Sequence, residues 1–289
     1  DYNAIVNSNE SLGLTVNPSK SEIMIINEDP LTSQQIMDRF LAITPGIKRI
    51  NNDDLTLLGS PINKESMEKI MLPKLESLKL MTSRLETIDS HEALFLLKNA
   101  FSIPKLTYFM RTSHLFLEPH ILEGFDKVLQ ESLQTILNTK LDESSWNQAS
   151  LPVTFGGIGV RKTQDLALPA FISSVYGAQE NVKNLLPTQI AQENSMYLDS
   201  ALELWQSKAV GASLPTNSKS QSAWDIPLSQ TKFDHLLSEA PNETEVARLK
   251  AISAPNSSDW LTAIPVSSLG LKLDNSSLLI ACGLRLGSH

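Results

Sequence analysis

The sequence is poor in cysteine and in aromatic residues, which narrows the kinds of protein it can encode. Its 289 residues include one cysteine, Cys282, so a disulfide within the chain and a cysteine-based zinc site are excluded. No apolar run approaches the roughly 20 residues that span a bilayer, and no signal-peptide pattern is visible. Hydrophobic residues still make up 41% of the chain, which is enough for one large or two small globular domains.

Basic residues are also scarce. The chain carries 24 Lys and Arg against 32 Asp and Glu, a net charge of −8, which argues against a protein that binds nucleic acid over a broad basic surface. Only the stretch 64–111 leans positive, with 8 basic and 6 acidic residues. Phosphate binding there would depend on where individual cations lie rather than on a broad field.

The spacing of apolar and turn-forming residues predicts an α+β protein that is predominantly α. Residues 1–63 are expected to be mixed. Leu14–Ile26 is typical of a strand, a turn at Asn17–Ser19 and a second strand. Ile47–Ile62 is predicted to be another hairpin with the polar Asn51–Asp54 at its tip, and a short helix capped by Thr32 or Ser33 is expected between them.

The rest of the chain is predicted to be helical, with two interruptions. Residues 64–141 keep helical spacing, with a kink or a helix boundary expected at Pro73 and a break at Ile103-Pro104. Residues 142–211 combine a glycine-turn hairpin with helices, one of them capped by Thr163. Residues 212–227, rich in Ser, Asn and Pro, are predicted to be a flexible linker, and 228–289 a helical extension.

Few groups in the sequence could carry chemistry. Asp53 and Asp54 are adjacent, as in polymerases that hold two magnesium ions, but a solvated turn accounts for them better because no third carboxylate precedes them convincingly. The run Phe155–Arg161, FGGIGVR, lacks the spacing of a dinucleotide or phosphate loop and favours a tight glycine turn.

The histidines and the cysteine are expected to be ordinary residues. His114, Glu118 and His120 do not share a helix face, so surface positions are favoured over metal ligands, and no metal site is predicted. Cys282 lies in an apolar helical stretch and is expected in the core.

Five stretches, taken in order, go beyond these patterns. They resemble the C-terminal half of the reverse transcriptase encoded by non-LTR-type retroelements of animal genomes, truncated at both ends. The stretches are Leu12–Met24, Leu55–Ile62, Leu94–Ser113, Leu151–Val175 and Ser267–His289. The resemblance implies a small β-hairpin palm remnant over 1–63, a helical thumb over 64–141 and a C-terminal helical extension.

The resemblance also implies roles for individual residues. Leu12–Ile26 is similar to the family's motif D, in which Lys20 would be the lysine near the phosphates of the incoming nucleotide. Leu55–Ile62 is similar to the motif E hairpin that grips the primer end, with Gly59 allowing a close approach. In the thumb, Lys98, Lys105 and Arg111 are the predicted contacts to the template–primer phosphates.

The parent reaction implied is RNA-templated DNA synthesis on an RNA template and a DNA primer, with Mg²⁺ as the cofactor of the full-length enzyme. It would take place inside the cell, and in the nucleus for an active element. The aspartates of motifs A and C do not precede the motif D-like stretch here, so this chain alone is expected to be inactive and to hold no cofactor. The alternative is a non-catalytic helical interaction protein, derived from a degenerate copy, that binds a protein partner and no membrane.

Overall fold

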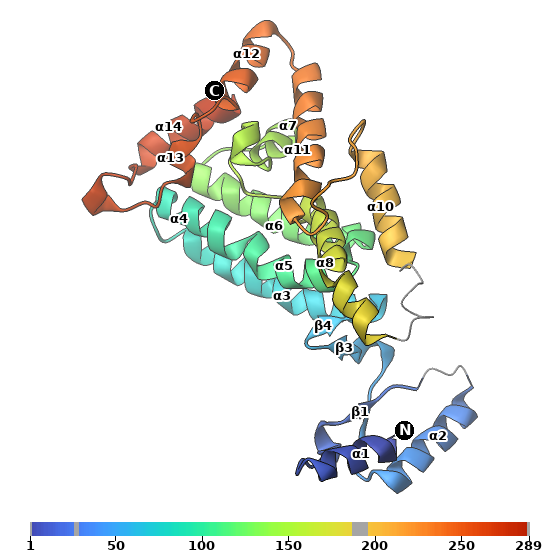
Figure 1. Cartoon of the computed structure of the whole chain (residues 1–289). Coiled ribbons are helices and arrows are strands. Elements are labelled where there is room, and N and C mark those ends of the chain that lie inside the picture. Colours follow the sequence, from blue (N-terminus) through green and yellow to red (C-terminus); the bar gives the residue numbers. More distant parts are fainter. Residues whose placement is uncertain (1, 26–28, 187–195, 288–289) are drawn as a thin grey trace. The chain divides into compact units, whose positions relative to one another are not determined.

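The computed structural model describes residues 2–25, 29–186 and 196–287, and most of them are helical (Figure 1). Within these ranges the strands are four segments of two residues each, so the predicted α+β, predominantly α class is confirmed. The chain divides into two compact units, residues 1–70 and 71–289. The further division of the second unit into thumb, hairpin, linker and extension stays a prediction.

The first unit combines short helices with two strand pairs. In chain order its elements are α1 (Tyr2–Ser11), the 3₁₀ turn η1 (Pro18–Lys20), β1 (Glu22–Ile23), α2 (Pro30–Ile43), β2 (Lys48–Arg49), the 3₁₀ turn η2 (Asn52–Asp54), β3 (Thr56–Leu57), β4 (Ser60–Pro61) and the start of α3 (Lys64–Leu85). The cap of α2 is Asp29, which accepts hydrogen bonds from the backbone N–H groups of Leu31 and Thr32, and not Thr32 or Ser33 as predicted.

The predicted hairpin over 14–26 is wrong. β1 pairs in parallel with β2, with Glu22 opposite Lys48 and Ile23 opposite Arg49. The predicted turn residues instead form η1, where the Asn17 side chain accepts a hydrogen bond from the backbone N–H of Ser19. A parallel partner must come from elsewhere in the sequence, because only antiparallel strands can be joined by a tight turn. Ile26 lies outside the described residues.

The second hairpin exists, but its tip is displaced from the predicted position. Asn52–Asp54 form η2, while β3 and β4 pair antiparallel around the two-residue turn Leu58-Gly59. Leu58 has φ +51° and Gly59 has φ +78°, the left-handed pair typical of a tight hairpin turn. The residues around Asp53 are polar, as turn residues usually are. The chain reverses direction at Gly59 instead, because glycine adopts a positive φ without strain.

The second unit is an assembly of helices. After α3, its elements are α4 (Ser90–Leu96), the π-helical turn η3 (Leu97–Phe101), α5 (Ile103–Thr112), η4 (Leu115–Leu117), α6 (Pro119–Leu137), α7 (Glu143–Ala149), η5 (Val153–Phe155), α8 (Thr163–Leu185), α10 (Met196–Lys208), α11 (Gln221–Ser238), α12 (Glu243–Ile252), α13 (Asp259–Thr262), η6 (Ser267–Leu269) and α14 (Asn275–Leu286). Helical periodicity therefore predicted the character of 64–141 correctly. The helix α3 continues through Pro73, whereas Ile103-Pro104 opens a new helix as expected.

The helix α8 is central to this unit, because it packs against α5, α6, α10 and α11. Its residues from Leu166 to Ser173 are all buried. The predicted cap, Thr163, is the first residue of the helix, and the cap is supplied from α6 by Asp126. The Asp126 carboxylate accepts hydrogen bonds from the backbone N–H groups of Thr163, at 2.5 Å, and Gln164, at 3.3 Å, and from the Thr163 hydroxyl, at 2.7 Å.

A tryptophan pair joins α10 to α11. Trp205 and Trp224 are both fully buried, their rings meet edge to face at 5.1 Å, and the Trp205 indole N–H donates to the Trp224 carbonyl at 2.8 Å. Within the predicted linker 212–227, the residues from Gln221 onward are helical, because α11 begins there. The segment 212–227 is polar and rich in serine, and this composition gave no sign that Trp224 would be buried.

Candidate nucleic-acid interface

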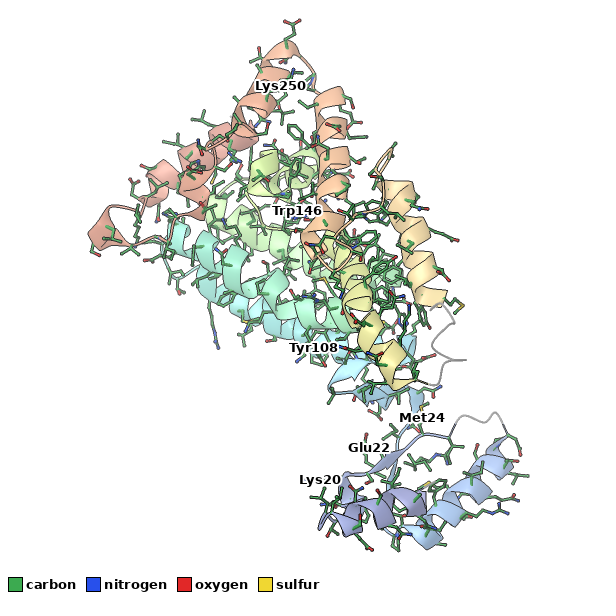
Figure 2. All side chains as sticks on the ribbon, in the orientation of Figure 1. Lys20, Glu22, Met24, Tyr108, Trp146 and Lys250 are labelled. Atoms are coloured by element: carbon green, nitrogen blue, oxygen red, sulfur yellow. The ribbon has the colours of Figure 1, made fainter. Side chains whose placement is uncertain are left out.

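The helix α5 exposes a stripe in which an aromatic residue lies between two cations. Lys105, Tyr108 and Arg111 follow one another at intervals of three residues, and Tyr108 is 44% exposed. Leu106, Phe109 and Met110 on the same helix are buried. Residues three apart on a helix are neighbours, so the stripe presents two positive charges around one ring. Figure 2 marks Tyr108 on this helix.

A third cation lies beside this stripe. The ammonium of Lys74, on α3, lies 5.5 Å from the centre of the Phe109 ring, and the Phe109 ring meets that of Tyr108 at 5.4 Å. A cation over an aromatic face is attracted by the ring quadrupole, which holds the lysine close to α5. We call Lys74, Lys105, Tyr108 and Arg111 the α5 surface. Sequence reasoning missed Lys74, because its link to α5 depends on how the two helices pack.

The predicted contact Lys98 is placed differently from Lys105 and Arg111. Its half-buried ammonium donates a hydrogen bond to the carbonyl of Leu261, and its stem packs 3.1 Å from the position that a Cβ on Gly159 would take. Burial lowers the pKa of this lysine, and the Arg285 charge adds to that effect. The geometry favours a role in holding the core together. Lys105 and Arg111 are both exposed, and neither has an acidic partner among the described residues.

The catalytic candidate Lys20 ends η1 and is exposed in the first unit. Figure 2 shows Lys20, Glu22 and Met24 following one another from η1 through β1. The turn is fixed locally, because the Ser21 hydroxyl donates to the Asn17 carbonyl at 3.0 Å. Lys20 therefore has a defined backbone position and a side chain that reaches solvent.

Gly59 lies at the tip of the β3–β4 hairpin. No atom approaches within 4 Å of the position that a Cβ would take, so only the backbone angle, and not crowding, requires glycine here. The neighbouring Leu58 is 89% exposed. The hairpin thus presents open backbone and an apolar side chain.

The described residues do not form a magnesium site. The Lys69 ammonium lies 3.1 Å from an Asp53 carboxylate oxygen and 2.6 Å from one of Asp54, and its hydrogen bond lowers the pKa of Asp54. Nowhere in 2–25, 29–186 and 196–287 do three or more His, Cys, Asp or Glu side chains gather as metal ligands. The residues present therefore do not fit the two ions that the parent reaction implies.

His114, Glu118 and His120 were expected at surface positions, which is wrong for Glu118, since its side chain is buried. His114 stacks on Tyr197, with ring centres 4.2 Å apart, while His120 lies 3.6 Å from the buried Glu118 carboxylate. The prediction that Cys282 lies in the core is confirmed, and burial raises the pKa of its thiol to about 12.

The glycine run is a structural turn, as predicted. A Cβ on Gly157 would lie 2.0 Å from the Leu151 carbonyl oxygen, so no other residue fits there without a shift of the backbone. Arg285, which is 4% exposed, holds the turn by donating to the carbonyls of Gly157, at 3.0 Å, and Val153, at 2.7 Å. The sequence carried no signal for this arginine, since a helix-terminal Arg is usually a surface residue.

Comparison with known proteins gives one distant relative. Over 158 residues, 55% of this chain, the sequence is 21% identical to the retrotransposable element SLACS 132 kDa protein of Trypanosoma brucei gambiense. The matched region spans 12% of that protein's length. No protein-family model and no solved structure matches. The match indicates a distant retroelement relationship.

The helices also bear on membrane association. None of the helices in the described part of the chain has the length and apolar character needed to span a bilayer.

Proposed function

We propose that this chain is part of a retroelement reverse transcriptase, an RNA-directed DNA polymerase, and that its α5 surface holds the RNA–DNA duplex by the phosphates. The observation that carries the proposal is the exposed sequence of cation, aromatic ring and cation along α5. Lys and Arg contacts to phosphates fix the position of a duplex without reading its sequence. The distant likeness to a retrotransposable element protein supports the same reading.

In this proposal Lys20 and Gly59 serve the growing end of the primer. Lys20 would offset the negative charge that develops on the phosphates of the incoming nucleotide. The open backbone at Gly59 would let the hairpin tip lie close to the primer. Lys98 is left out of the interface, because its ammonium already binds the carbonyl of Leu261.

The test is the affinity of the full chain for a short RNA–DNA duplex, measured by fluorescence anisotropy. The double variant Lys105→Gln/Arg111→Gln should bind at least about 10-fold more weakly, since charged hydrogen bonds contribute more than neutral ones. The double variant Lys183→Gln/Lys250→Gln removes the same charge from exposed positions on α8 and α12 and should bind as the parent chain does. Equal losses in the two variants would contradict a localised interface.

A second function has its own support in the first unit. α1 buries none of its residues, and Ile5, Leu12, Leu31 and Leu58 are each more than half exposed. Such apolar surface favours contact with another protein, as expected of a non-catalytic interaction protein. A stable protein partner without affinity for RNA–DNA duplex would favour this alternative over the polymerase fragment.

Primer extension separates the parent activity from the activity of this chain. We expect no Mg²⁺-dependent DNA synthesis by the chain alone, because its described residues do not form a two-ion site. Synthesis by the purified chain, lost on adding a chelator, would contradict this.

A further inference from the structure

A cavity in the second unit lies apart from the α5 surface. Its volume is about 280 Å³, and it is formed by α8, α11, the end of α10 and the segment before α8. Leu168 and Leu228 give it apolar walls. Its five charged lining residues are Arg161, Asp165, Lys208, Asp225 and Lys232.

The two main walls of this cavity are helices that each contain an internal proline. Pro169 follows Leu168 within α8, and Pro227 precedes Leu228 within α11. A proline inside a helix removes one backbone hydrogen bond and crowds the preceding turn. In both helices the proline lies next to the leucine that lines the cavity.

Ion pairs hold the same two walls in place. Arg161 donates to both carboxylate oxygens of Asp225, at 2.7 and 2.8 Å, and Lys232 on α11 pairs with Asp165 on α8. The side chains of Arg161 and Asp225 are only 15% and 12% exposed. A two-pronged Arg–carboxylate pair of this kind fixes geometry as well as charge, so the cavity is formed before any ligand arrives.

One positive charge remains after these pairs are formed. Lys208, an exposed residue at the end of α10, lines the cavity and has no acidic partner in the described ranges. We propose that the cavity binds a small organic anion, a carboxylate carried on a compact aliphatic body. Lys208 would attract the carboxylate, while Leu168 and Leu228 would cover the aliphatic part.

The size of the cavity sets the size of the ligand. It lies just below the ~300–1,000 Å³ that small-molecule pockets occupy, and it exceeds the ~150 Å³ that accommodates benzene. A branched carboxylate of about eight non-hydrogen atoms suits this space. The proposal does not depend on the polymerase assignment.

Isothermal titration of the full chain with isocaproate tests the proposal, with isocaproamide as the uncharged probe of the same shape. We expect saturable binding of isocaproate with a dissociation constant of about 1 mM or tighter. The amide should bind about 3- to 5-fold more weakly, because an ion pair near solvent contributes up to ~1 kcal/mol. No saturation by isocaproate would overturn the proposal.

Two variants locate the binding. Lys208→Gln should weaken isocaproate about 3- to 5-fold and leave the amide unchanged. Leu228→Phe should fill the cavity and abolish binding of both probes, with folding confirmed by circular dichroism. Lys250→Gln, an exposed change on α12, should alter neither. Binding that is insensitive to Lys208→Gln overturns the proposal even where Leu228→Phe prevents folding.

Discussion

Asp126 lies on α6, and its buried carboxylate caps the N-terminus of α8. It is 5% exposed, and burial raises its pKa to about 6, with a further contribution from the charge of Asp165. Its hydrogen bonds to Thr163 and Gln164 oppose that shift. The residue therefore supplies three bonds to the start of α8 at the cost of keeping a charge inside the protein at neutral pH.

This balance makes Asp126 a pH-dependent contributor to stability. Its folded pKa of about 6 exceeds the 3.8 of the free group, so the folded state binds the proton more tightly. The stability it contributes is full below pH 3.8 and is lost as the pH rises through 6, by about 3 kcal/mol in total.

The variant Asp126→Asn measures that dependence. Asparagine cannot titrate and loses the acceptor for the Gln164 N–H, so it should be less stable than the parent chain by about 1–3 kcal/mol near pH 4. By pH 7 the difference in free energy of unfolding should shrink or reverse. Urea unfolding at the two pH values checks this, and a difference that grows with pH would contradict it.

The burial or exposure of a side chain could be predicted from the sequence where the residue lies in a regular helix. The exposure of Lys105 and Arg111 and the burial of Cys282 follow from helical spacing. Lys98 turned inward because it lies in the π-helical turn η3, which departs from the 3.6-residue period on which such predictions depend. Arg285 and Asp126 could not be foreseen, since their partners are distant in the sequence.

Among the elements, the β3–β4 hairpin has a turn residue that does not suit the backbone conformation it adopts. Its tip places Leu58 at φ +51°, a region that side chains larger than Asn and Asp rarely adopt. The sequence predicted this hairpin with its tip at Asn51–Asp54 instead of Leu58-Gly59, and it did not predict the parallel pairing of β1 with β2, because no short-range signal connects those strands.

Replacing Leu58 with asparagine should relieve this strain. Asn-Gly is the preferred sequence for such a two-residue turn, so Leu58→Asn should raise the free energy of unfolding by about 0.5–1 kcal/mol. Leu57→Asn changes an exposed neighbour in the extended strand β3 and should not stabilise the chain. Chemical denaturation compares the two, and a loss of stability in Leu58→Asn would show that the leucine side chain makes a needed contact.

The helix α11 is anchored by its first turns. Trp224 is 1% exposed, and its indole N–H donates to the Ser218 carbonyl at 2.8 Å. Trp224→Ala should lower the free energy of unfolding by about 3–5 kcal/mol. Limited proteolysis should then cut near Gln221, where we expect the parent chain to resist cleavage. Unchanged resistance would mean that the segment is held by contacts other than this ring.

Over the whole molecule, the negative net charge works against the proposed binding of an RNA–DNA duplex. The net charge of −8 repels phosphates, so binding must depend on a few cations placed close together, and the α5 surface places such cations beside an exposed ring. A locally attractive site on a repulsive protein predicts weak, strongly salt-dependent affinity.

The most direct test of this account is the salt dependence of RNA–DNA duplex binding. Each phosphate contact releases counterions, so the slope of log affinity against log salt reports how many contacts form. The slope of Lys105→Gln/Arg111→Gln should be shallower than that of the parent chain by about 2. A parent chain that binds no duplex at low salt, or a variant with an unchanged slope, would contradict the proposal that α5 holds the duplex.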